Sequence, residues 1–182
     1  MTGVSLEPPG PRPRLFAVGM VYSANIFRVD EVPALPAKVL ASDYRHVVDG
    51  MAVSAACAFA QLGGSVKICA RVGDDELGRV IRHDLAAEGI DISGLHTIPG
   101  SVSSRVCIIV DRRGDRLVVP YLDPNFDPSP DWLPLHQVAD AGFVHCDVRW
   151  VDGSEAALRA ARKAAIPGMV DGDVAPLAAL QR

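Results

Sequence analysis

The sequence predicts an α/β fold in which a mostly parallel sheet is flanked by helices. Of the 182 residues, 49% are hydrophobic but only 5% are aromatic, so small aliphatic side chains dominate. Side chains of this size allow helices to pack closely on both faces of a parallel sheet. In addition, strand-like apolar runs alternate with helical stretches in the order of βαβ units.

The clearest such unit runs from Gly50 to Gly78. Residues 50–62 carry no charge and predict a helix that is buried on most sides. After a turn, residues 65–70 predict a buried strand. Asp74 or Asp75 can then cap a second helix, and this explains the two adjacent carboxylates better than metal binding does.

The remaining elements follow in chain order. Strands are predicted at residues 15–20, 142–148 and 168–173, and helices at about 131–140 and at 154–165, the latter capped by Ser154. Residues 104–110 and 116–121 flank a charged turn and predict a hairpin. With the extended stretches 26–29 and 39–48, this hairpin predicts a small sheet that stands off the main body.

Composition limits the possible functions. The net charge is −4 and no basic stripe is present, so we expect no nucleic-acid partner. We find no signal peptide and no membrane segment, and residues 1–13, with four prolines, predict a disordered tail. The four cysteines lie far apart, as expected of free thiols in a reducing compartment. These observations predict a cytoplasmic protein that does not bind membranes.

Residues 71–78, with the sequence RVGDDELG, form the most specific motif. Together with the preceding helix, this motif resembles the N-terminal signature of the PfkB/ribokinase family of carbohydrate kinases. The resemblance extends from Arg14 onward and is also strong at residues 103–111. Residues 146–153 and 170–173 look most like the sulfofructose-kinase branch. The resemblance implies a ribokinase-like fold in which residues 14–182 form an incomplete kinase domain without its C-terminal part. Lid strands would lie within about 25–48 and 104–121.

The resemblance also implies an activity, namely ATP- and Mg²⁺-dependent phosphotransfer to a hydroxyl of a sugar, possibly a sulfonated or otherwise anionic one. The family's catalytic G-A-G-D motif does not occur in the sequence, so we assign no catalytic residue or metal ligand and expect these residues alone to be inactive. A homodimer formed through the β lid is the expected assembly. Two alternatives remain open: a non-catalytic sugar- or anion-binding remnant of the same fold, and a kinase for a nucleoside or another sugar.

Six residues are candidates for substrate binding. Lys38 and Arg149 match the positions that hold the sulfonate in the sulfofructose-kinase branch, and Arg105 is a third basic candidate. Asn25 and the adjacent pair Asp49 and Gly50 complete the set.

Each basic candidate also has a structural interpretation. Lys38 is also explained as a solvated loop residue, and Arg149 as the ion-pair partner of Asp147 or Asp152. Arg105 fits an edge residue of the lid that prevents aggregation.

The sequence departs from the family at several substrate positions. An aspartate that binds sugar hydroxyls in the family is matched by Ala24, and the family's asparagine by Val53. Both changes remove hydrogen-bonding groups. Asp171 and Asp173, after the last predicted strand, are further candidates for the substrate or Mg²⁺ region, because ligands of open α/β sheets bind at the carboxyl ends of the strands.

Overall fold

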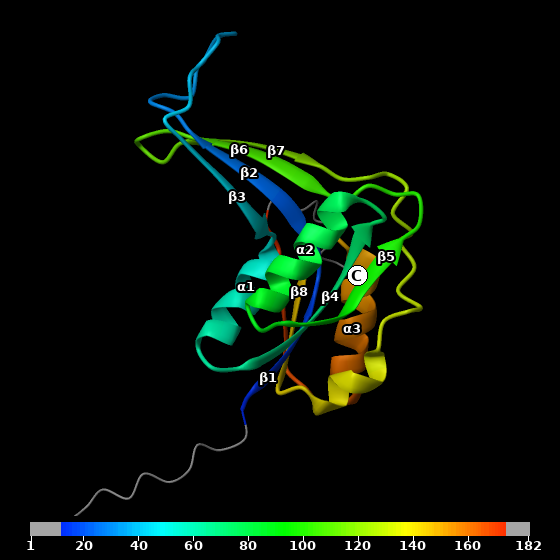
Figure 1. Cartoon of the computed structure of the whole chain (residues 1–182). Coiled ribbons are helices and arrows are strands. Elements are labelled where there is room, and N and C mark those ends of the chain that lie inside the picture. The colour runs from blue at the N-terminus through cyan, green and yellow to red at the C-terminus, as the bar shows by residue number, and fades with distance from the viewer. Residues whose placement is uncertain (1–11, 174–182) are drawn as a thin grey trace, which may run out of the picture.

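The body of the molecule is a parallel sheet in the strand order β5-β4-β1-β8-β9 (Figure 1). The computed structural model describes residues 12–173. The strands of the body are β1 (Arg14–Val18), β4 (Ser65–Gly73), β5 (Asp91–Ile98), β8 (Phe143–Asp147) and β9 (Gly168–Asp171). The prediction of a mostly parallel sheet in an α/β fold is therefore confirmed.

Helices cover both faces of this sheet. Helices α1 (Met51–Gln61) and α2 (Glu76–Ala87) pack on one face, while α3 (Val151–Lys163) and the short 3₁₀ helix η1 (Leu135–Asp140) pack on the other. Each face has its own apolar cluster, and small residues such as Ala56 and Ala157 lie fully buried where helices meet strands. The small side chains thus fulfil the close packing expected from the composition.

A second sheet, the lid, extends away from the body (Figure 1). It contains β2 (Tyr22–Arg28), β3 (Asp43–Asp49), β6 (Arg105–Val110) and β7 (Arg116–Tyr121) in the order β3-β2-β6-β7. β2 pairs with β6 in parallel, and the other two pairs are antiparallel. The predicted hairpin is the β6–β7 pair.

Three details differ from the sequence prediction. The edge strand β5 was not predicted, because its mixed pattern of polar residues, with Gly94, lacks a continuous apolar run. The helix predicted at 131–140 is only the 3₁₀ helix η1, since Pro134 interrupts any longer α-helix. Ser154 does not cap α3; the helix begins at Val151, and the Ser154 hydroxyl donates to the Asp147 carbonyl at 2.7 Å.

Candidate functional site

A cleft of about 540 Å³ lies between the lid and the body. Its lid side is apolar and includes Val106 and Val118 from β6 and β7. Its body side lies at the N-terminus of α1 and at the carboxyl ends of β8 and β9. The polar residues here are Asp49, the last residue of lid strand β3, and, from the body, Ser54, His145, Arg149, Asp171 and Asp173. Open α/β sheets bind ligands at this end of their strands, so this cleft is the candidate site.

Gly50 sets the junction between lid and helix α1. Its φ of +140° is a conformation that side-chain-bearing residues rarely adopt, and a Cβ atom there would lie 2.3 Å from the Met20 carbonyl oxygen. The close approach lets β3 turn directly into α1 and places Asp49 on the cleft wall. There, the Asp49 carboxylate accepts a hydrogen bond from the Ser54 hydroxyl at 3.0 Å.

Asp147, at the end of β8, organises the base of the cleft from inside. Its fully buried carboxylate accepts backbone N–H groups of Met20 and Arg149, both at 2.9 Å, and also that of Ala52. Burial raises the pKa of Asp147 even though these N–H groups favour its charged form. One carboxylate therefore joins the end of β1, the start of α1 and the turn after β8.

Arg149 lies in that turn and projects into the cleft. Its guanidinium forms an ion pair with Asp173, and one third of the side chain remains exposed. Asp173 is thus an ion-pair partner of this arginine, whereas Asp147 contacts only its backbone N–H in the hydrogen bond described above. The result is a mixed-charge site with a partly accessible cation.

Three further polar cleft residues, Tyr22, Ser54 and His145, were missed in the sequence. Tyr22, the first residue of the lid, lies close to Arg149, and burial raises the pKa of its phenol. His145 lies within β8 and is only 4% exposed. Burial lowers the pKa of its imidazole, although Asp147 and Asp171 favour the protonated form. For Tyr22, the available signal was the carboxyl-end rule, because the residue follows shortly after strand β1. For His145, in the middle of an apolar strand, the sequence offered no such signal.

The structure brings together three of the six predicted binding residues: Asp49, Gly50 and Arg149 all line the cleft. Asn25 and Arg105 lie on the other face of the lid. Successive side chains of a strand point to opposite faces, and Val106, which lines the cleft, is in register with Ala24 rather than with Asn25. Asn25 accepts a hydrogen bond from the Tyr44 hydroxyl there, at 2.7 Å.

Lys38 lies in the exposed loop between β2 and β3, at the far end of the lid (Figure 1). It is not among the residues that line the cleft. Lys38 and Arg149 therefore do not share a cleft within one chain, contrary to the sequence expectation. Ala24 and Val53, the positions matched to sugar-binding residues of the family, are 0% and 1% exposed.

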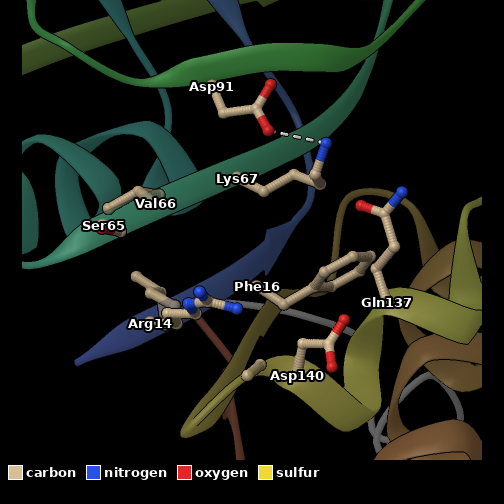
Figure 2. Close-up of a pocket in the computed structure, with 10 residues that line it drawn as sticks. Arg14, Phe16, Ser65, Val66, Lys67, Asp91, Gln137 and Asp140 are labelled. Atoms are coloured by element: carbon tan, nitrogen blue, oxygen red, sulfur yellow. Dashed lines mark ion pairs between the residues drawn. The ribbon is translucent and has the colours of Figure 1, made fainter. Parts of the chain in front are cut away.

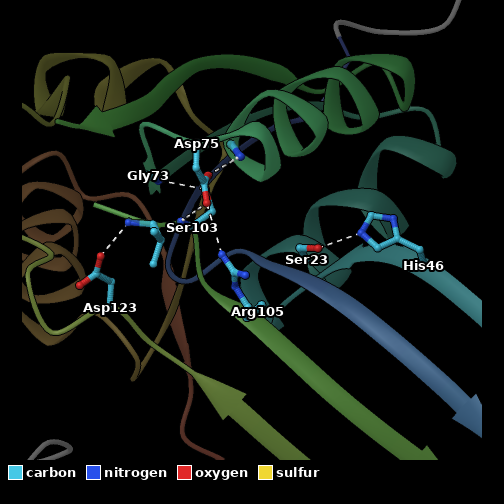
Figure 3. A network of polar contacts seen from close by, with 9 residues as sticks. Ser23, His46, Gly73, Asp75, Ser103, Arg105 and Asp123 are labelled. Carbon is cyan, nitrogen blue, oxygen red and sulfur yellow. Dashed lines mark hydrogen bonds and ion pairs between the residues drawn. The ribbon is translucent and has the colours of Figure 1, made fainter. Parts of the chain in front are cut away.

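Asp75 anchors the base of the lid strand β6 (Figure 3). It caps α2 by accepting the Gly78 N–H at 2.9 Å, which confirms the predicted cap. The same carboxylate accepts the hydroxyl and the N–H of Ser103, at 2.6 and 3.0 Å, and pairs with Arg105 at 3.4 Å. Burial alone would raise the pKa of Asp75, but these contacts together lower it. The most specific motif of the sequence thus connects body and lid.

Asp123, two residues after the end of β7, adds a second anchor in Figure 3: it accepts the Val102 N–H at 2.7 Å. This bond joins the segment that enters β6 to the segment that leaves β7. The two ends of the β6–β7 hairpin are therefore held together by this hydrogen bond.

A smaller cavity of about 330 Å³ opens at the opposite end of the sheet (Figure 2). It lies at the amino ends of β1, β4 and β5. Its lysine, Lys67, is already paired with Asp91 at 2.7 Å. Its location at the amino ends of the strands makes it the weaker candidate for substrate binding.

Metal ligands do not gather in the part of the chain that the structure describes. Among residues 12–173, no group of three or more His, Cys, Asp or Glu side chains gathers where it could hold a cation. Asp173, one of the two candidates for the Mg²⁺ region, is paired with Arg149.

Within the same range, no helix is long and apolar enough to span a bilayer.

A parallel α/β body, a β lid and a polar cleft between them define the class of ribokinase-like proteins. Within this class, the chain belongs to the pfkB family of carbohydrate kinases, whose family model matches residues 14–177.

Similar proteins agree with this assignment. An ATP-dependent ribose-1-phosphate kinase of Halopiger xanaduensis is 26% identical over 165 residues, which are 88% of this chain and 56% of the relative. A fructokinase of Klebsiella pneumoniae is 33% identical over 87 residues, or 47% of this chain and 28% of that protein.

Solved structures show the same fold. A crystal structure from Agrobacterium tumefaciens, which carries a provisional ribokinase name, has a TM-score of 0.89 and 36% identity over 94% of this chain and 56% of its own. A ribokinase of Cryptococcus neoformans in complex with ADP has a TM-score of 0.78 at 18% identity, covering 94% of this chain and 54% of that one. The chain thus spans about half the length of the relatives that it matches over most of its own length.

Proposed function

We propose that this chain is the substrate-binding portion of an ATP- and Mg²⁺-dependent pfkB-type sugar kinase whose acceptor sugar carries an anionic group, as in a sulfonated or phosphorylated sugar. The observation that carries the proposal is Arg149, a partly accessible arginine in the cleft between lid and body. A guanidinium binds phosphate or sulfonate oxygens in a bidentate manner. In support, the Halopiger relative is named for a phosphorylated sugar.

The chain's own residues supply binding and orientation. The apolar inner face of the lid excludes water from the sugar, and Asp49 and Ser54 offer hydroxyl ligands on the opposite wall. ATP would supply the phosphoryl group, and the G-A-G-D motif that the family uses for phosphoryl transfer does not occur in the sequence. We therefore propose that the 182 residues bind sugar without turning over ATP.

Calorimetric titration of the chain with D-ribose, D-fructose, ribose 1-phosphate and a sulfonated fructose tests the proposal. Arg149→Ala should weaken the anionic sugars by about 1.5–3 kcal/mol, the typical contribution of a hydrogen bond to a charged group, and leave the neutral sugars nearly unchanged. Arg162→Ala, an exposed arginine on α3, is the matched control. Equal losses for neutral and anionic sugars would show that Arg149 has a structural role only.

ADP release is measured in the same samples with ATP present. We expect no turnover by the 182-residue chain. ATP turnover by the wild-type chain that is lost in an Arg149 variant would contradict the proposal that these 182 residues bind sugar without turning over ATP.

A further inference from the structure

His145 is the buried histidine of the chain and lies on the floor of the cleft. The other four lie closer to the surface, in the half-exposed or exposed class; His46, for example, contacts the Ser23 hydroxyl, and His83 contacts Asp84. In β8, His145 stands between Ala17 of β1 and Met169 of β9, on the sheet face that α1 covers. No catalytic or structural contact described above uses its imidazole.

The Nδ1 atom of His145 is buried without a hydrogen-bond partner among residues 12–173. Buried polar side-chain atoms in native proteins are nearly always paired, and an unpaired one lowers stability. The nearest buried carboxylate, Asp147, already accepts three backbone N–H groups. This unpaired nitrogen belongs to a side chain that lines the cleft, so a ligand hydroxyl that reaches the imidazole would supply the missing partner.

The chemistry of the surroundings specifies which kind of ligand group fits. Burial keeps the imidazole in its neutral form, with one nitrogen as a donor and the other as an acceptor. A sugar hydroxyl is likewise both donor and acceptor. An anionic group instead matches Arg149, and the carboxylate of Asp171, whose charge acts on the imidazole, disfavours an anion there.

We propose that His145 forms a hydrogen bond with one hydroxyl of the acceptor sugar and so selects among sugars by the position of that hydroxyl. The proposal rests on the proposed function, because it requires the cleft to bind a sugar. It assigns two separate tasks: Arg149 binds the anionic group, and His145 recognises a neutral hydroxyl. The same division explains how the site works although Ala24 and Val53 have replaced the sugar-binding residues that the family pattern led us to expect there.

The test compares His145→Leu and His145→Gln with wild type. Leucine fills a similar volume without polar atoms, so the ligand-free His145→Leu protein should melt at the same temperature as wild type or a higher one. For any sugar that wild type binds, the affinity of His145→Leu should be about 5- to 10-fold lower than that of wild type, as expected for the loss of one neutral hydrogen bond. Glutamine retains a donor and an acceptor and should restore part of the affinity. His83→Leu, on the exposed side of α2, is the control and should bind like wild type.

Monodeoxy analogues of the bound sugar identify the partner hydroxyl. For the analogue that lacks it, His145→Leu should cause no further loss, whereas the other analogues should lose the same 5- to 10-fold. A uniform loss across the whole series would mean that the substitution only reshapes the cleft, and the proposal would fail.

The outcomes separate the two proposals. If wild type binds a sugar and both His145 variants bind it equally well, only the role of His145 is overturned. If both variants lose stability but not affinity, the imidazole is structural. If wild type binds none of the four sugars in the titration, the proposed function falls, and the role of His145 falls with it.

Discussion

Single residues set the junction at which the lid meets the body, and Gly50 is the clearest example. Its φ of +140° and the Met20 carbonyl oxygen, 2.3 Å from the position of an added Cβ, both exclude a side chain. Gly63 also has a positive φ, +91°, but an added Cβ would meet nothing within 4 Å. The two glycines therefore separate backbone strain from steric overlap.

We expect Gly50→Ala to lower the free energy of unfolding by at least about 3 kcal/mol, because strain and overlap add. Gly63→Ala carries strain alone and should cost about 1 kcal/mol. Urea unfolding of both variants measures the difference. Equal costs would mean that the Met20 segment moves freely and does not fix the junction.

The candidate site shows at the residue scale what sequence could and could not predict. Asp49, Gly50 and Arg149 were found because each lies next to a recognisable motif or strand end. His145 was missed because an isolated histidine in an apolar strand reads as a core residue. Asn25 and Arg105 were wrongly predicted to lie with them. Which face of the lid meets the cleft depends on the register between β2 and β6, and this register joins residues about eighty positions apart in the sequence.

At the scale of elements, the turn between β4 and α2 is a connection between body and lid. Asp75 takes four contacts there, from Gly78, Ser103 and Arg105. Its carboxylate serves the cap of a body helix and the base of a lid strand at once. Capping of α2 was predictable from local sequence, whereas the contact with Ser103 was not, because it depends on how β5 leads into β6.

The pH dependence of stability tests this connection. The pKa of Asp75 in the folded protein lies below its ordinary value of 3.8. The charged carboxylate therefore stabilises the fold above about that pH, and the contribution is lost as the pH falls through the lowered pKa. Asp75→Asn should cost about 1–3 kcal/mol at pH 7, because bound donors lose their charged acceptor.

The Asp75→Asn variant should also lose less stability than wild type between about pH 4 and pH 2. This range begins at about the ordinary pKa of aspartate and extends below it. Asp74→Asn, at the exposed neighbouring carboxylate, is the matched control and should follow the wild-type curve. Parallel acid-unfolding curves for wild type and Asp75→Asn would show that Asp75 does not connect the two parts.

At the scale of the whole molecule, the lid has more apolar surface than one cleft requires. On the face away from the cleft, Leu117, Val119 and Tyr121 of β7 are 48%, 55% and 48% exposed. Phe27 and Tyr44 extend this surface, with ring centroids 5.1 Å apart. A contiguous apolar face of this kind marks an interaction site, and a second copy of the chain offers a matching face.

We therefore propose a homodimer formed through the lid. Size-exclusion chromatography with light scattering should show a dimer that dissociates on dilution. Val119→Lys places a charge in the contact and should yield the monomer. Val170→Lys, on the edge strand β9, is the comparison because it is also exposed. If Val170→Lys and not Val119→Lys removes association, the chains meet through the edge of the body sheet.

In each of the two lid hairpins, the strand that leaves the body and the strand that returns to it meet at their base. The β2–β3 hairpin leaves the body after Met20 and returns at Gly50, where the two backbones touch. The β6–β7 hairpin leaves near Val102 and returns at Asp123, which is bonded to the Val102 N–H. Without the two hairpins, the chain still reads β1-α1-β4-α2-β5, an uninterrupted series of βαβ units. The lid thus consists of two insertions, and a change in either one would alter the surface over the cleft without changing the order of strands in the body.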